Sequence, residues 1–144
     1  MKGSTDSERS MCHEANMELI TMSFGLIGDT LTIPDGIKII GSTAFGYEGS
    51  YITTLIIPDS VEEIRGSAFA FSSVQHIEIG SGVKVMEYPF SYCRSLKTVV
   101  IKDGTTTIGS SAFDNCSNLE TVTIPDSVVY MRMMLSITIY TSRL

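Results

Sequence analysis

The stretch VVIKDGTTTIGSSAFDNCSNLETVTIPDS, residues 99–127, contains the pattern that decides the fold. Its apolar residues and turn sequences recur three more times upstream, with Ala-Phe in two of these repeats and Pro-Phe in the third. The isoleucine that ends each apolar run marks the repeat, and these anchors are Ile33, Ile57, Ile79, Ile101 and Ile124. The anchors follow one another at steps of 22–24 residues. A short, nearly fixed period of this kind predicts a solenoid in which each repeat forms one coil.

Each anchor ends a short segment in which apolar residues occupy every second position, as in Leu55-x-Ile57. A period of two is typical of a strand with one buried face. Pro-Asp-Gly or Pro-Asp-Ser follows the strand in three repeats, at residues 34–36, 58–60 and 125–127. Proline offers no hydrogen-bond donor to a sheet, and the next two residues favour turns, so each strand should stop there. We therefore expect one strand per coil.

A phenylalanine follows each of the first four anchors. Phe45, Phe69 and Phe113 come twelve residues after their anchors, each preceded by alanine, whereas Pro89-Phe90 comes eleven residues after its anchor. Further apolar positions lie between anchor and phenylalanine, with Thr105 as an imperfect match. One coil has too little area for a core of its own, so stacked coils must share one.

The repeat of residues 99–124, which includes Ile108-Gly109, Ala112-Phe113, Cys116 and Leu119, resembles the BspA-like (treponemal-type) leucine-rich repeat family. The resemblance extends over about residues 30–131. It implies a leucine-rich repeat solenoid, a right-handed β-rich superhelix with a parallel sheet on one side and short strands and helical turns opposite. It also implies a surface or secreted protein that mediates adhesion or protein contacts, without catalysis and without a cofactor.

The chain divides into four segments. Residues 1–16 are polar and aperiodic, and we expect a disordered tail. Residues 17–30 alternate and predict a capping strand or hairpin, with a degenerate preceding repeat as the alternative. The repeats occupy residues 31–131. In residues 132–144 the pattern fails, either because a frameshift replaced the continuation (one choice of codons restores Ala-Phe in another frame) or because a genuine final strand caps the solenoid. An exposed solenoid end would favour self-association.

Composition excludes several classes of function. The formal net charge of −6 and the isoelectric point near 4.8 argue against binding to nucleic acid, which requires clustered Lys and Arg. The sequence has no run of eighteen apolar residues, so we expect no membrane span. MKGSTDSERS, the first ten residues, lacks the apolar segment of a signal peptide. The location thus stays open, although the resemblance suggests the cell surface or secretion.

The strand residues that point away from the core form the candidate binding surface. They are Thr30, Thr32, Thr54, Ile56, His76, Glu78, Thr98, Val100, Thr121 and Thr123. Stacked strands would arrange them in two columns, and we predict that this face binds a protein or glycan ligand. An alternative explanation of the threonines is that threonine is a favoured strand residue and needs no ligand. Two alternative functions for the repeats are a spacer in a larger surface protein and a truncated remnant without independent function.

Catalysis and metal binding have little support. His76 and Glu78 share one face of a strand, but the sequence supplies no nucleophile beside them. Cys12-His13-Glu14 are adjacent residues, which rarely close on one metal ion. The aspartates at the turns, one per coil, are too sparse for calcium and are explained by turn formation. We therefore predict neither an enzyme nor a metal site.

Two of the three cysteines, Cys93 and Cys116, occupy the same repeat position. Adjacent coils would bring them within the Cα separation of a disulfide, about 5 Å. Three cysteines do not make a disulfide framework, however, and small thiols suit a buried position. We expect free thiols, with the disulfide as the alternative.

Overall fold

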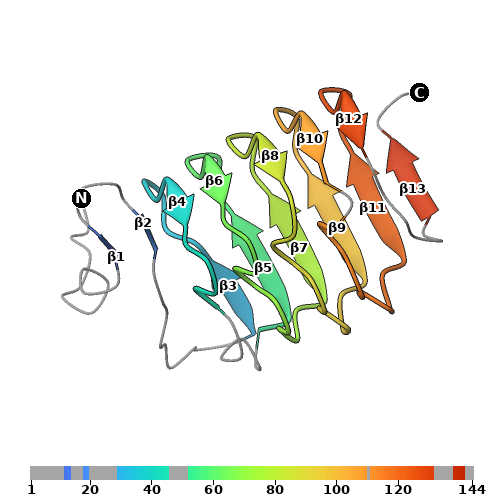
Figure 1. The fold of residues 1–144 in the computed structure, drawn as a ribbon, viewed down its shortest axis with the longest axis horizontal. Helices are drawn as coiled ribbons and strands as arrows, with labels where there is room; N and C mark the ends of the chain where they lie inside the picture. The colour runs from blue at the N-terminus through green and yellow to red at the C-terminus, as the bar shows by residue number, and fades with distance from the viewer. Residues whose placement is uncertain are drawn as a thin grey trace.

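The structure is a computed structural model, and it describes residues 29–45, 52–109 and 111–131 together with the backbone of 12–13, 18–19 and 138–141. Two rows of parallel strands form the solenoid, one long sheet and one row of short strands on the opposite side (Figure 1). The strands of the long sheet are β3 (Thr30–Thr32), β5 (Thr54–Ile57), β7 (His76–Ile79), β9 (Thr98–Ile101), β11 (Thr121–Ile124) and β13 (Thr138–Thr141).

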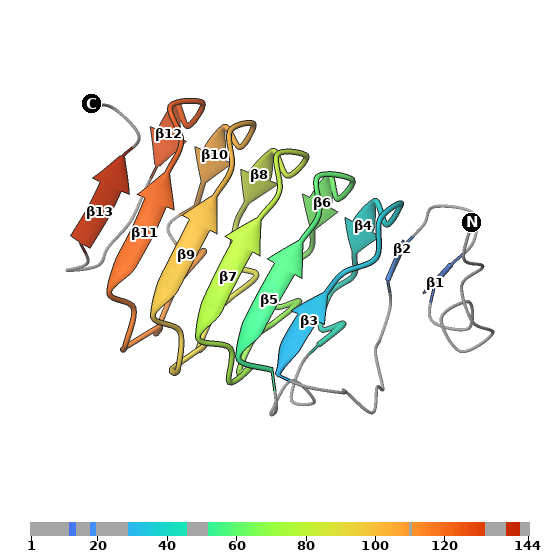
Figure 2. The ribbon, with the colours of Figure 1, turned by 180° about the vertical axis from the view of Figure 1, so that it is seen from behind.

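The short strands come between the long ones along the chain. They are β4 (Ile39–Ile40), β6 (Glu63–Ile64), β8 (Val85–Met86), β10 (Thr107–Ile108) and β12 (Tyr130–Met131). Figure 2 shows the molecule with the long sheet in front. The strand order of this sheet is β13-β11-β9-β7-β5-β3, and every neighbouring pair is parallel. Each coil thus contributes one long and one short strand, and the expected parallel solenoid is confirmed.

Alternation along the strands determines what lies between the two rows. In β5 and β7 every second residue is buried, and these inward residues include Leu55, Ile57, Ile77 and Ile79, each at most 1% exposed. The phenylalanines form a column through this core. Phe45 stacks on Phe69 with ring centroids 4.6 Å apart, and the stack continues through Phe90 at 5.4 Å to Phe113 at 5.8 Å. Neighbouring coils therefore share their core, as the repeat pattern requires.

The imperfect repeat position is resolved by a hydrogen bond. Thr105 is fully buried where the preceding coils place Val61 and Val83. Its hydroxyl donates to the Val83 carbonyl over 2.8 Å, so the polar side chain is satisfied inside the core. At the adjacent turn, a Cβ on Gly104 would lie 2.1 Å from the carbonyl oxygen of Ser81. Only glycine permits the coils to approach so closely there.

The resemblance implied short strands and helical turns opposite the long sheet. Within the described ranges this side has short strands and turns, and no helix. Bonds of the i to i−3 type, such as Ala70 N–H to the Ser67 carbonyl, close them individually. No helix in the described part of the chain has the length and hydrophobicity that a bilayer span requires.

At the N-terminal end, β1 (Cys12–His13) pairs antiparallel with β2 (Glu18–Leu19), and β2 pairs parallel with β4. Residues 20–28, which carry most of the expected capping strand, lie outside the described residues. At the other end β13 adds a strand beside β11. Residues 132–137, where the repeat pattern fails, also lie outside the described residues.

Candidate functional site

The pairing register of the long sheet arranges its outward residues in two columns. Thr54, His76, Thr98 and Thr121 are direct neighbours in the first column, which begins at Thr30. The second column contains Thr32, Ile56, Glu78, Val100 and Thr123. Because parallel in-register strands lie about 4.8 Å apart, each column is a regular row of side chains on a rigid backbone. We call these ten residues the sheet face.

Charged, polar and apolar groups alternate across the centre of the sheet face. His76 and Glu78 are exposed, and Val100 beside Glu78 is 41% exposed. The imidazole Nδ1 of His76 and the hydroxyl Oγ1 of Thr98 form a hydrogen bond of 2.5 Å across the strands. This bond holds the ring against the neighbouring strand. The centre of the face thus has a defined shape and chemistry before any partner arrives.

The turn aspartates bind the backbone of the following coil. Asp59 accepts a hydrogen bond from the Ser81 N–H over 2.9 Å, and Lys102 lies 3.8 Å from the same carboxylate. The Ser81 N–H, assisted by the charge of Lys102, lowers the pKa of Asp59 below its ordinary value of 3.8. Asp103 likewise accepts from the Ser127 N–H over 3.3 Å. These aspartates therefore link neighbouring coils by hydrogen bonds. The described residues contain no group of three or more His, Cys, Asp or Glu that could hold a metal ion.

The equivalent cysteines are buried free thiols in neighbouring coils. Each thiol donates to a carbonyl one coil earlier, Cys93 to Phe69 and Cys116 to Phe90, both over 3.1 Å. The hydrogen bond with Cys93, together with burial, raises the pKa of Cys116. In this structure both cysteines are therefore free thiols, as expected. Both sulfurs belong to the core and lie away from the sheet face.

The sequence analysis missed an exposed aromatic pair in the turns that follow the core phenylalanines, which we call the outer turns. Phe71 and Tyr92 stack with ring centroids 4.9 Å apart and an angle of 12° between the planes. They are 51% and 37% exposed. A signal existed in the sequence, because each lies two residues after a core phenylalanine. The stacking itself is visible only once the coils are in register.

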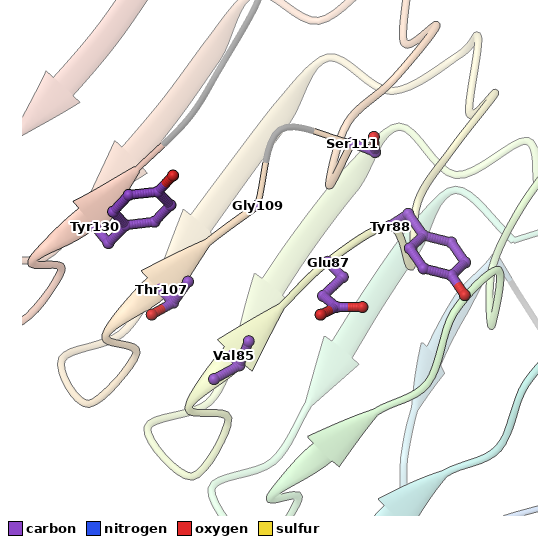
Figure 3. A pocket seen from close by; sticks show the side chains of 7 residues that line it. All are labelled: Val85, Glu87, Tyr88, Thr107, Gly109, Ser111 and Tyr130. Carbon is purple, nitrogen blue, oxygen red and sulfur yellow. The ribbon is translucent and has the colours of Figure 1, made fainter.

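A groove of about 360 Å³ lies on the short-strand side, between β8 and β12. Figure 3 shows Tyr130 at one end, Tyr88 at the other and Glu87 between them. The ring of Tyr88, however, lies over Gly66, where a Cβ would come within 2.2 Å of it. Tyr88 therefore packs on one side against the preceding coil, although 44% of the residue stays exposed.

Solved structures of leucine-rich repeat proteins are similar to the chain. A leucine rich cell surface protein from Faecalibacterium prausnitzii matches with a TM-score of 0.69 and 30% sequence identity, covering 83% of this chain and 35% of that chain. The pneumococcal vaccine antigen PcpA matches with a TM-score of 0.56 and 21% identity, covering 86% of this chain and 41% of that one. At 21% identity the likeness to PcpA shows the fold alone. The chain spans less than half the length of either protein.

No curated protein sequence matches the chain. The repeat pattern itself does find a family. The BspA type leucine rich repeat region matches six times between residues 28 and 135, which covers most of the chain and agrees with the resemblance of residues 99–124. The chain therefore belongs to the BspA type leucine rich repeat family.

Proposed function

We propose that this chain is a non-catalytic recognition module of a surface or secreted protein and that its sheet face binds a protein partner. The observation that carries the proposal is the pairing register. It holds two columns of exposed side chains, with His76, Glu78 and Val100 at their centre, on a rigid parallel ladder. Such a surface can recognise a partner without the cost of ordering a loop.

The location rests on the structural likeness. The protein from Faecalibacterium prausnitzii that matches at 30% identity is described as a cell surface protein. A recognition function rests on the mixture of groups at the sheet face. A carboxylate (Glu78), a hydrogen-bonded imidazole (His76) and two apolar residues, Ile56 and Val100, resemble the composition of transient protein interfaces.

The size of the face sets an expectation for affinity. The five strands of the sheet face at about 4.8 Å and four residues at about 3.3 Å give a projected area of roughly 300 Å². A standard protein interface buries about 800 Å² on each partner. We therefore expect weak binding by this chain alone, strengthened by avidity when several such modules act together.

An array of purified extracellular proteins and glycans, probed with the chain, would test the proposal. Joint replacement of Thr54, His76, Glu78 and Thr98 by alanine should weaken capture of a protein without lowering the melting temperature. A matched control replaces four outward residues of the short strands, Glu63, Val85, Thr107 and Tyr130.

Unchanged capture by the sheet-face variant would rule this face out. If the chain captures nothing on the array, the alternative gains support, in which the repeats act as a spacer in a larger surface protein. Capture of glycans alone would replace the protein partner with a glycan. Concentration-dependent dimerisation of the chain would support self-association through the solenoid ends, where β3 and β13 form the edges of the long sheet.

A further inference from the structure

The outer turn that follows each core phenylalanine has the same unusual backbone in three successive coils. Phe71, Tyr92 and Asn115 have positive φ angles of 65°, 62° and 56°. The fold therefore imposes a left-handed conformation at this position. Asparagine adopts it readily, whereas bulky aromatic residues rarely do. Two coils thus carry a residue type that the backbone disfavours, and their stacking on each other offsets part of that cost.

The two aromatic rings form a short exposed stack. Phe71 covers one face of Tyr92. The position that would continue the stack on the other side of Tyr92 belongs to Asn115 in the next coil. The amide Nδ2 of Asn115 donates to the Asp114 carboxylate over 2.9 Å, so this short side chain is held by its neighbour in the same turn. The second face of Tyr92 consequently has no aromatic neighbour among the described residues.

Residues that donate and residues that accept hydrogen bonds lie next to Tyr92 in the fold. Asp114, Asn115 and Arg94 are all exposed. Backbone bonds place Asp114 and Arg94 next to the main chain of Tyr92: the Tyr92 N–H donates to the Asp114 carbonyl over 2.7 Å, and the Arg94 N–H donates to the Tyr92 carbonyl over 2.9 Å. Asn118 fixes the Arg94 carbonyl in turn, through its Nδ2 at 2.6 Å. A carboxylate, an amide and a guanidinium therefore extend from backbone positions next to Tyr92.

This combination matches the chemistry of a sugar ring. A pyranose has an apolar face of C–H groups, which stacks on an aromatic ring, and a rim of hydroxyls that donate and accept hydrogen bonds. Asp114 and the Asn115 oxygen accept such bonds, and Arg94 and the Asn115 amide donate them. The local acid and base balance each other, while the net charge of the chain is −6. A neutral sugar is therefore favoured over an anionic one.

We propose that the open face of Tyr92, together with the neighbouring residues Asp114, Asn115 and Arg94, binds a neutral pyranose residue of a glycan. The sugar takes the place of the next ring in the aromatic stack, above Asn115. This site lies on the outer turns and uses none of the sheet-face residues, so it is independent of the proposed protein-binding face.

Titration of the full chain with four neutral trisaccharides (cellotriose, chitotriose, mannotriose and maltotriose) tests the site, with amide chemical shifts measured by NMR. We expect at least one of them to shift the amides of Tyr92, Asp114 and Asn115. Tyr92→Asn removes the ring but suits the left-handed backbone, as the native Asn115 shows, so it should remain folded. It should weaken binding about tenfold, the equivalent of losing one aromatic stack.

Asn115→Tyr places a ring where the sugar is expected, and it should also abolish the shifts. Tyr130→Asn, which removes an exposed tyrosine on the short-strand side, is the matched control and should bind like the native chain. Equal binding by the native chain and Tyr92→Asn overturns the proposal. So does the absence of shifts at Tyr92, Asp114 and Asn115 with all four sugars, or shifts confined to the sheet face.

Discussion

The phenylalanine column provides the sharpest test of how the solenoid is stabilised. Phe69 is 2% exposed and stacks on both Phe45, at 4.6 Å, and Phe90, at 5.4 Å. Phe69→Leu retains a buried apolar side chain but removes both ring contacts. Aromatic pairs contribute about 0.5–1.5 kcal/mol each, and the change of shape costs up to about 1.5 kcal/mol. We therefore expect a loss of about 1–4.5 kcal/mol in the free energy of unfolding, which a domain of ordinary stability survives.

The same geometry predicts an energetic coupling between the phenylalanine rings of adjacent coils. In a double-mutant cycle, Phe69→Leu and Phe90→Leu should interact by about 0.5–1.5 kcal/mol, because their rings are in contact. Phe69→Leu and Phe113→Leu should be additive within about 0.5 kcal/mol, because Phe90 stands between them. The difference expresses the nearest-neighbour energetics of a repeat protein.

Urea unfolding followed by circular dichroism measures all of these free energies. The second pair serves as the control, since it combines the same kinds of substitution at a larger separation. A coupling energy of equal size in both pairs would refute the nearest-neighbour reasoning. A coupling energy of zero for Phe69 and Phe90 would show that stacking contributes nothing beyond the burial of apolar area.

Two further predictions concern titration and reactivity. Lys102→Met should raise the pKa of Asp59 toward 3.8 only in part, because the hydrogen bond from the Ser81 N–H remains. A carboxyl-resolved NMR titration measures the pKa of Asp59 in this variant and in the control variant Lys97→Met. Since folding lowers this pKa, its contribution to stability is present above about pH 3.8 and is lost as the pH falls through the folded-state value, so the native chain should lose more stability in acid than Asp59→Asn. Cys93 and Cys116 should resist a thiol reagent in the native protein and react after unfolding, because both are buried; labelling read by mass spectrometry decides, and a thiol pair that stays unreactive in denaturant would reveal a disulfide.

Much of the architecture was predictable from local pattern. Period-two alternation, as in Leu55-x-Ile57, predicts which side of each strand is buried, because successive side chains of a strand point to opposite faces. The fixed spacing of the anchors then predicts which strands become neighbours. The outward columns of the sheet face follow from these two facts, although whether they bind a partner does not.

Other features depended on contacts between residues one coil apart. The turn aspartates were explained as local turn formers, but Asp59 also holds the Ser81 N–H, 22 residues later in the chain. Thr105 looked like a defect, and its hydroxyl is satisfied by the Val83 carbonyl of the preceding coil. No local pattern contains these partners, because the register between coils brings them together.

The sequence by itself determined the repeat, the strand of each coil and the buried faces, since these follow from the periodicity of apolar residues along the chain. Only the tertiary structure decided where exposed chemistry converges. The positive φ at Tyr92 arises from the path of the coil, and its stacking on Phe71 requires two coils in register. Recognition surfaces on a solenoid are assembled across coils, so their geometry appears only when the coils stack.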